Sequence, residues 1–255
     1  MTAERVNLNS GGAMPLLGFG TWQLRGDAAY RAVLAALEAG YRHIDTATMY
    51  GNEDEVGRAL RDSGVPRDDV FVTTKLPPER AGREDETLAA SLRALGLDAV
   101  DLWLIHWPPR GSVAVWERFV AARQDGRARA IGVSNYDLGE IDELTAATGV
   151  TPAVNQIRFG PALYDAKLVA GHRERGVVVE GYSPFKTTNL RDRTLVRIAE
   201  AHDADPARVV LRWHVQRGIV VIPKSARPER ITRNLDLSFA LTEAELTEID
   251  ALAGR

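Results

Sequence analysis

The sequence predicts an α/β protein, a closed (β/α)8 or TIM barrel of eight parallel strands with an N-terminal β-hairpin. Short runs rich in β-branched residues alternate with amphipathic helical patterns along nearly the whole chain. The runs suit strands that are buried on both faces, as in parallel sheets. The length of 255 residues is typical of one such barrel. We therefore expect a single domain over residues 1–255.

Each expected strand precedes a helical pattern. The strands are expected at residues 16–22, 41–47, 70–76, 100–107, 129–135, 152–157, 177–185 and 219–225. The segment 5–16 predicts a hairpin with its turn at 9–12. An open doubly wound sheet is disfavoured because the first βα turn, "GFGTW", lacks the G-x-G-x-x-G dinucleotide loop.

Helix-end residues support the expected boundaries. Gly40 stops the first helix, and Asp205 followed by Pro206 starts a late one with a cap and a first-turn proline. Asn52 and Glu55 have the spacing of a capping box. The acidic cluster at 53–55 is most simply a favourable charge at a helix start.

Composition excludes several functional classes. The net charge of −3 gives no electrostatic reason to expect nucleic acid or an anionic membrane. There is no cysteine, which removes disulfides, thiolate zinc sites and thiol catalysis. No apolar run reaches the roughly 18 residues of a membrane span, and the start lacks a signal-peptide core. We expect a cytoplasmic protein without nucleic-acid or membrane partners.

Polar and aromatic residues gather where the expected strands end, the position of chemistry in such barrels. They are Trp22, Asp45, Tyr50, Lys75, His106, Ser134, Asn135, Gln156, Tyr182, Ser183, Lys224 and Ser225. In a closed barrel these strand ends ring one mouth, so side chains far apart in sequence can converge there.

Four of these residues suit the protonation of an oxygen that gains negative charge. Tyr50 is a poor acid unless a cation such as Lys75 stabilises its phenolate, and Asp45 can keep that lysine charged. His106 can hydrogen-bond a substrate oxygen or share the proton. Lys75 is notable because only four of the 32 Lys and Arg residues are lysines. A carbonyl reduced by hydride has this need, and the hydride must come from a cofactor.

Several longer motifs carry a family resemblance. "DTATMYGNEDEVG", "TTKL", "LDAVDLWLIHWP", "AIGVSN", "VNQI", "GYSPF" and "LRWHVQRGIVVIPKSARPERITRN" occur in order over nearly the full chain. Together they resemble the aldo-keto reductase family, and in particular its small prokaryotic members of the 2,5-diketo-gluconate reductase type. The resemblance implies an NADPH-binding barrel in which Tyr50 donates the proton, Lys75 and Asp45 tune its pKa, and His106 orients the carbonyl.

The same resemblance implies the cofactor contacts. Ser134, Asn135 and Gln156 suit the nicotinamide carboxamide, and Tyr182 offers an aromatic face to the ring. The "PKSARPERITRN" segment supplies Lys224, Ser225 and Arg230 for a 2′-phosphate, which favours NADPH over NADH. The remaining implied contacts are Gly20, Thr21, Trp22 and Asp45, with Ser183, Phe185 and Thr187 along the pyrophosphate path and Asn234 at the adenine.

The substrate is expected to be a small carbonyl compound. Trp22, Met49 and Trp107, with Tyr50 and His106, are expected to form its pocket. The loop "PPRGS" after Trp107 is short, and the chain ends at residue 255 directly after the last expected helix. Both features predict an open, weakly selective site. The family usually has Glu where Arg233 stands, at a residue that contacts the adenine. It usually has Glu-x-His-Pro where "RFGP" stands, a change to which the sequence assigns no function.

Several of these residues also fit simpler interpretations, and two rival functions use some of them. Asp45 alone suits a strand-end turn and His106 a core histidine, and we take His43, Trp103, Trp116 and Trp213 as core. A metal-dependent barrel hydrolase using His43, Asp45 and His106 is one rival, but it leaves Tyr50 and Lys75 unused. We expect no metal. A barrel that binds NADPH without turnover is the other rival. The family leans monomeric, so we expect a monomer.

Overall fold

The computed structural model describes residues 4–254, and it confirms the expected barrel of parallel strands. The sheet has eight strands in the order β10-β9-β8-β7-β6-β5-β4-β3, and every neighbouring pair is parallel. The strands are β3 (Phe19–Gly20), β4 (His43–Asp45), β5 (Phe71–Leu76), β6 (Val100–Ile105), β7 (Ala128–Ser134), β8 (Val154–Arg158), β9 (Val178–Tyr182) and β10 (Val220–Val221).

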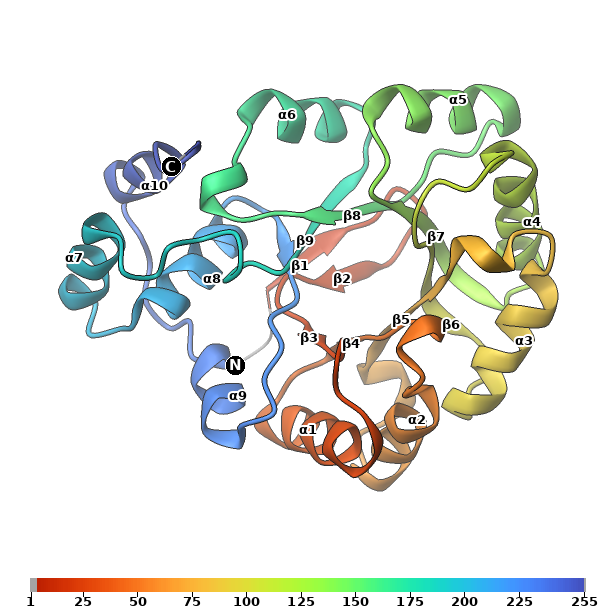
Figure 1. The fold of residues 1–255 in the computed structure, drawn as a ribbon, viewed down its shortest axis with the longest axis horizontal. Coiled ribbons are helices and arrows are strands. Elements are labelled where there is room, and N and C mark those ends of the chain that lie inside the picture. The colour runs from red at the N-terminus through yellow and green to blue at the C-terminus, as the bar shows by residue number, and fades with distance from the viewer. Residues whose placement is uncertain (1–3, 255) are drawn as a thin grey trace.

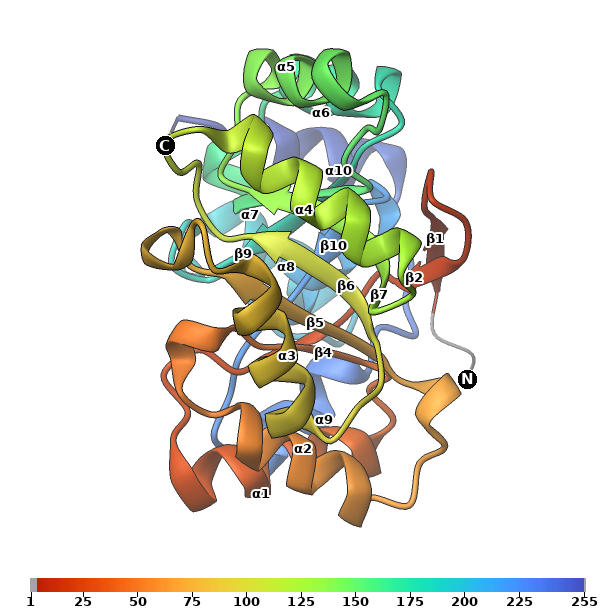
Figure 2. The same cartoon turned by 90° about the vertical axis from the view of Figure 1, so that its right-hand side faces the viewer.

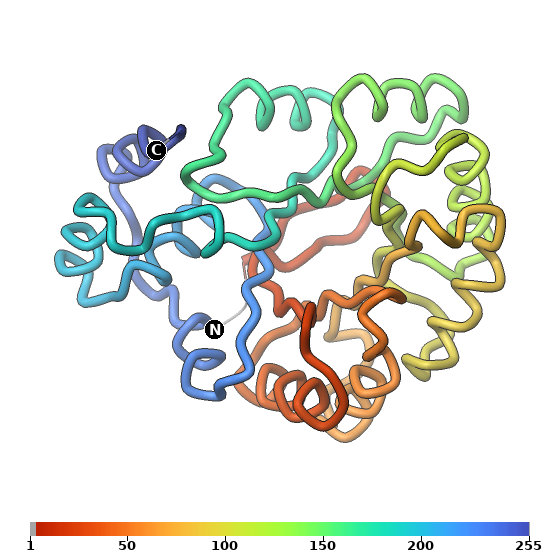
Figure 3. The backbone as a smooth tube through the Cα atoms, in the orientation of Figure 1, coloured from red at the N-terminus to blue at the C-terminus, as the bar shows by residue number. Residues whose placement is uncertain are grey.

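Hydrogen bonds between the first and last strands close the sheet into a barrel. Leu17 bridges Val221 in parallel, and the Val221 amide donates to the Leu16 carbonyl over 2.8 Å. The Gly20 amide donates to the Pro223 carbonyl over 3.1 Å. In Figure 3 the red segment that holds β3 therefore runs beside the blue segment that holds β10. Closure places all the strand ends around one mouth.

Helices surround the strand ring (Figure 1). One helix or helix pair follows each barrel strand, with α7 and α8 both between β9 and β10. The helices are α1 (Gly26–Ala39), α2 (Glu53–Asp62), α3 (Glu84–Leu95), α4 (Ser112–Gln124), α5 (Leu138–Thr148), α6 (Ala166–Glu174), α7 (Arg193–Ala201), α8 (Pro206–Gln216), α9 (Pro228–Leu235) and α10 (Glu243–Asp250). Among residues 4–254, none of the helices combines the length and apolar character that a bilayer crossing requires.

The N-terminal hairpin covers the end of the barrel opposite the mouth. Its strands are β1 (Arg5–Asn7) and β2 (Ala13–Pro15), paired antiparallel around the expected turn. Leu8 and Met14 pack with Phe71 and Val220, which begin barrel strands. Figure 2 shows the hairpin at one edge of the molecule, and Figure 1 shows it behind the strand ring. It keeps water out of the barrel interior.

Most of the core lies between the strands and the surrounding helices. Trp103 and Trp116 belong to this layer together with Phe119, and the Trp103 and Phe119 rings stack with centroids 3.6 Å apart. Trp213 packs in a second cluster around α7, α8 and α10. All three tryptophans are buried, as the sequence predicts.

The helix-end predictions are partly right. Gly40 ends α1 in the left-handed conformation (φ 115°), and the Asp205 side chain accepts from the Arg208 amide ahead of Pro206. The capping box of Asn52 and Glu55 is wrong. The Asn52 side chain makes no cap bond, because it is buried and its Nδ2 donates to two backbone carbonyls of the β3–α1 loop instead.

Gly20 is expected to be essential for barrel closure. A Cβ at this position would lie 2.9 Å from the backbone oxygen of Ile222, directly after β10, in a segment that cannot move without opening the barrel. Gly20→Ala should therefore lower the free energy of unfolding by about 1–3 kcal/mol, measured by urea denaturation. Gly139→Ala on α5 is the control. Its Cβ would meet only a side-chain oxygen, so an equal loss in both variants would contradict the assignment.

Candidate active site

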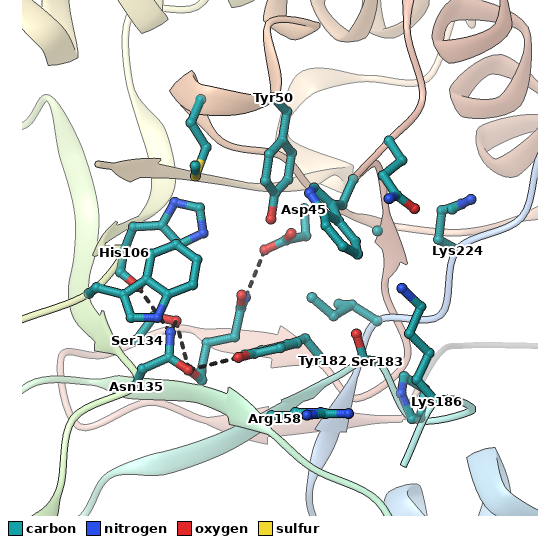
Figure 4. Close-up of a pocket in the computed structure, with 18 of the residues that line it drawn as sticks. Asp45, Tyr50, His106, Ser134, Asn135, Arg158, Tyr182, Ser183, Lys186 and Lys224 are labelled. Atoms are coloured by element: carbon teal, nitrogen blue, oxygen red, sulfur yellow. Dashed lines mark hydrogen bonds between the residues drawn. The ribbon is translucent and has the colours of Figure 1, made fainter. Parts of the chain in front are cut away.

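The mouth of the barrel contains a cavity of about 650 Å³. It is lined by residues from the carboxyl ends of most strands and the loops that follow them. Figure 4 shows Tyr50 and His106 on one side and Tyr182 facing them across the cleft. The predicted residues that line it are Gly20, Trp22, Asp45, Met49, Tyr50, His106, Trp107, Ser134, Asn135, Gln156, Tyr182, Ser183, Phe185 and Lys224.

A buried ion pair lies behind the phenol of Tyr50. Lys75 Nζ is 2.7 Å from Asp45 Oδ1 and donates to the Thr46 carbonyl over 2.8 Å. Its remaining donor points to the Tyr50 hydroxyl at 3.5 Å. Lys75 and Asp45 are almost fully buried. The ammonium is therefore held by fixed acceptors and directed at the phenolic oxygen.

The electrostatics differ in one respect from the sequence expectation. Burial acts to lower the pKa of Lys75, but Asp45 and Tyr50 outweigh it and the pKa lies above its usual value. Burial raises the pKa of Tyr50, and Lys75 acts in the opposite direction without cancelling that rise. We expected Lys75 to lower this pKa overall. In this structure its effect has the expected sign but is smaller than the effect of burial.

His106 is a neutral imidazole at the edge of the cleft. Burial and the positive charge of Lys75 lower its pKa to about 2. Its ring meets the Tyr50 ring edge-on with centroids 5.8 Å apart and stacks on Trp107 at 4.2 Å. A neutral ring beside a phenol can donate one hydrogen bond to a substrate oxygen without competing as a base.

Local hydrogen bonds hold Tyr50 over the ion pair. Tyr50 ends a single 3₁₀ turn (Thr48–Tyr50), which Gly51 closes in the left-handed conformation (φ 60°). The Thr48 hydroxyl donates to the Lys75 carbonyl over 2.9 Å. The Asn52 side chain does not cap α2. Its amide donates to backbone carbonyls of the β3–α1 loop and so connects this turn to that loop. The "DTATMYGN" segment (residues 45–52) thus holds both Tyr50 and Asp45 in place.

A second hydrogen-bonded group faces the cleft opposite Tyr50. Asn135 Nδ2 donates to the His106 carbonyl and to Ser134 Oγ, and Asn135 Oδ1 accepts from the Tyr182 hydroxyl over 2.9 Å. Asn135 and Ser183 adopt positive φ angles of 63° and 57°, a strained conformation for residues other than glycine. Both follow strand ends at the mouth.

Other predicted cofactor residues lie outside this cavity. Thr21 is buried and its hydroxyl donates to the Asp45 carbonyl. The Thr187 hydroxyl donates to backbone carbonyls and the residue lines an adjoining hollow. Ser225 lies just before α9, and Arg230 and Asn234 lie within it, Arg230 exposed and Asn234 buried. Arg233 lies 3.6 Å from Asp205, so this departure from the family has an acidic partner.

Three large apolar side chains are exposed at the mouth. Trp22, Met49 and Trp107 have 45%, 49% and 39% of their surface accessible. The short loop from His106 to α4 leaves this side of the cavity uncovered. The three side chains form an apolar rim suited to a small organic molecule.

Sequence reasoning missed several residues of the site. Gln23, Arg158, Pro184, Lys186 and Ile222 also line the cavity. Glu180 is fully buried beneath it and accepts from Gln156 Nε2 over 2.9 Å. Alternation along β9 could have revealed it, because Glu180 lies two residues before Tyr182 and so on the same face.

The structure does not bring metal ligands together for the hydrolase rival. Within residues 4–254, there is no group of three or more His, Asp or Glu side chains placed to hold a metal ion. His43 is buried as expected and contacts Thr73 and Glu180. His43, Asp45 and His106 therefore do not form the centre that this alternative requires.

The fold and site define a (β/α)8 barrel with a buried ion pair and a phenol at its mouth, the architecture of a barrel enzyme. The particular family follows from comparison with known proteins. The model of the aldo/keto reductase family matches residues 16–253. The chain belongs to the aldo/keto reductase family, a family of oxidoreductases.

Relatives and solved structures agree with this assignment. An aldo-keto reductase of Mycolicibacterium smegmatis is 46% identical, covering 98% of this chain and 94% of the relative. The crystal structure of an aldo/keto reductase from Brucella melitensis has a TM-score of 0.95 at 42% identity, over 98% and 100% of the chains. The Bombyx mori aldo-keto reductase in complex with NADP has a TM-score of 0.93 at 34% identity, over 100% and 94%.

The buried ion pair makes a stability prediction. Lys75→Met leaves the Asp45 carboxylate without its ammonium partner in a dry site, and should cost about 3–5 kcal/mol of unfolding free energy. Adding Asp45→Asn removes the orphan charge, so the double variant should be more stable than Lys75→Met alone. Urea denaturation measures both. A double variant with the summed losses of the two single variants would contradict the pairing.

Proposed function

We propose that this protein reduces the carbonyl group of small aldehydes or ketones with hydride from NADPH, using Tyr50 as the proton donor. The observation that carries the proposal is the position of Lys75 Nζ, 2.7 Å from Asp45 and 3.5 Å from the Tyr50 hydroxyl, at the mouth of the barrel. Family membership supports an oxidoreductase of this kind.

The side chains supply the proton and orient the substrate oxygen. The bound cofactor would supply hydride to the carbonyl carbon. The Tyr50 hydroxyl donates its proton to the carbonyl oxygen, and the adjacent Lys75 ammonium stabilises the phenolate that remains. Asp45 keeps Lys75 charged and in place. The neutral His106 donates a hydrogen bond that directs the carbonyl oxygen towards Tyr50.

The cleft residues suit a nicotinamide cofactor. Tyr182 lines the cleft with its hydroxyl tied to Asn135, so its ring is fixed as a stacking surface. A 2′-phosphate suits a group of three residues: Lys224 at the cleft, Ser225 just before α9 and the exposed Arg230 on α9. This group favours NADPH over NADH. The Bombyx mori relative, solved in complex with NADP, supports this cofactor. Asn234 on the same helix is assigned to the adenine.

The apolar rim supports the proposed substrate class. Trp22, Met49 and Trp107 leave a wide, exposed opening beside Tyr50, which suits small carbonyl compounds of varied shape. We further propose that residues 1–255 act as one NADP-dependent domain, as a cytoplasmic monomer. A barrel that binds NADPH without turnover is the alternative. A screen of aldehydes, dicarbonyls, keto sugars and ring ketones, followed by loss of NADPH absorbance, separates the two.

Tyr50→Phe tests the proton donor. It removes the hydroxyl and keeps the ring, so the dissociation constant for NADPH should stay near normal while kcat falls by roughly 10²-fold or more. Fluorescence titration measures the dissociation constant, and steady-state kinetics measure kcat. Tyr30→Phe is the control, because that hydroxyl bonds to Asp62 on the outer helices. An unchanged kcat in Tyr50→Phe would refute the assigned role.

Arg230→Ala tests the phosphate assignment. Loss of a guanidinium that contacts the 2′-phosphate should weaken the binding of NADPH by about tenfold or more. The binding of NADH, which lacks this phosphate, should change little. Competition titrations with both cofactors give the ratio. Arg31→Ala, an exposed arginine on α1, is the control. Equal losses for the two cofactors would contradict the assignment.

A further inference from the structure

A second buried carboxylate lies beneath the cleft, outside the four residues used for proton transfer. Glu180 is at the centre of β9 and is fully buried. Its Oε2 accepts from Gln156 Nε2 over 2.9 Å, while its Oε1 is buried without a hydrogen-bond partner among the described residues. A buried, half-satisfied carboxyl group is costly and calls for a specific explanation.

Gln156 links this carboxyl group to the catalytic ion pair. Its Nε2 donates to Asp45 Oδ2 over 2.8 Å as well as to Glu180 Oε2. An amide nitrogen has two hydrogens, so both are committed to carboxyl oxygens inside the barrel. Gln156 also lines the cleft. The amide oxygen is then the polar atom it has left for a ligand, and a ligand group placed there must donate a hydrogen bond.

We propose that Glu180 is a positioning residue that, together with Asp45, holds the Gln156 amide with its hydrogens inward and its oxygen towards the cleft. This inference rests on the proposed function, because the group that would donate to Gln156 is the carboxamide NH₂ of the nicotinamide. Glu180 thereby fixes the polarity of a cofactor contact that it does not touch itself.

The charges around Glu180 indicate that it holds a proton at neutral pH. Burial and the Asp45 carboxylate raise its pKa to about 8. Four titratable groups face Glu180. They are His43 and Asp45 on β4, Tyr50 on the 3₁₀ turn after β4, and Lys75 on β5. Lys75 is paired with Asp45, and burial lowers the pKa of His43 to about 3. A second carboxylate would therefore lack a buried counter-ion.

The hydrogen bonds place this proton on one oxygen. Because Oε2 accepts from Gln156, the proton belongs on Oε1, which faces His43 Nε2 at 3.7 Å. The His43 ring is lodged against the backbone of residue 18, where a Cβ would lie 2.4 Å from its Nδ1. Gly18 thus lets the neutral imidazole sit beside the protonated oxygen.

Two substitutions at this position separate the hydrogen bond from the charge. Glu180→Gln keeps an acceptor for Gln156, so the Kd for NADPH at neutral pH should stay within about twofold. Glu180→Met removes the acceptor and frees the amide, so this Kd should rise about tenfold. The KM for an aldehyde at saturating NADPH should change much less. Fluorescence titration of NADPH and steady-state kinetics measure these values.

Glu53→Met is the matched control for the loss of a buried carboxyl group. Glu53 bonds to Thr74 and Ser91 and not to Gln156, so its removal should leave the Kd for NADPH within about twofold. A folded Glu180→Met variant that binds NADPH as tightly as the wild type, or no more weakly than Glu53→Met, overturns the inference. Failure of the wild type itself to bind NADPH would instead overturn the proposed function.

A stability measurement tests the protonated state without any cofactor. Between the ordinary Glu value of 4.5 and about 8, the unfolded chain releases a proton that folded Glu180 keeps. The wild type should therefore lose stability relative to Glu180→Gln as pH rises through this interval, and the difference should level off above it. Urea midpoints of the two proteins give the difference. A difference that does not change with pH would overturn the protonated Glu180, even if Glu180→Met failed to fold.

Discussion

The site depends on one constraint, that a lysine ammonium inside a barrel must be surrounded by fixed acceptors. Lys75 is fully buried and finds Asp45, the Thr46 carbonyl and the Tyr50 hydroxyl. A buried charge is costly unless each donor is satisfied. The need to satisfy it brings the third donor onto the phenol. The arrangement that makes Lys75 tolerable in the interior therefore also directs its ammonium at the Tyr50 hydroxyl.

Barrel closure is what allows these acceptors to come from separate parts of the chain. Asp45 ends β4, Lys75 lies near the end of β5 and Gln156 lies within β8. The bonds between residues 16–20 and 221–223 complete the ring, and the hairpin seals its far end with apolar side chains. The interior is thus dry below and polar at the mouth. The low dielectric of the interior strengthens the hydrogen bonds and the ion pair among these buried polar side chains.

Hydrophobic periodicity and the polar residues at strand ends were sufficient to predict the strands and the side chains that meet at the mouth. Strand positions, the Asp205 cap and the convergence of Asp45, Tyr50, Lys75 and His106 on one mouth are confirmed as positions, while their roles stay predictions. The capping box at Asn52 was wrong because a buried tertiary partner outweighed the local pattern. Glu180 was missed because a single acidic residue inside an apolar strand run gives only a weak local signal, its alternation with Tyr182 along β9. Only the register of β8 and β9, which pairs Gln156 with Glu180, brings it to the site.

Most titratable groups around Tyr50 are held in one protonation state. His43 and His106 are held neutral, with pKa values lowered to about 3 and about 2 by burial and by Lys75. Glu180 is held neutral by the opposite shift, because burial and Asp45 favour its protonated form. Lys75 and Asp45 cancel one another. These neighbours of Tyr50 are therefore not placed to compete for its proton, which fits the proposed role of the phenol as the acid for a carbonyl oxygen in the cleft.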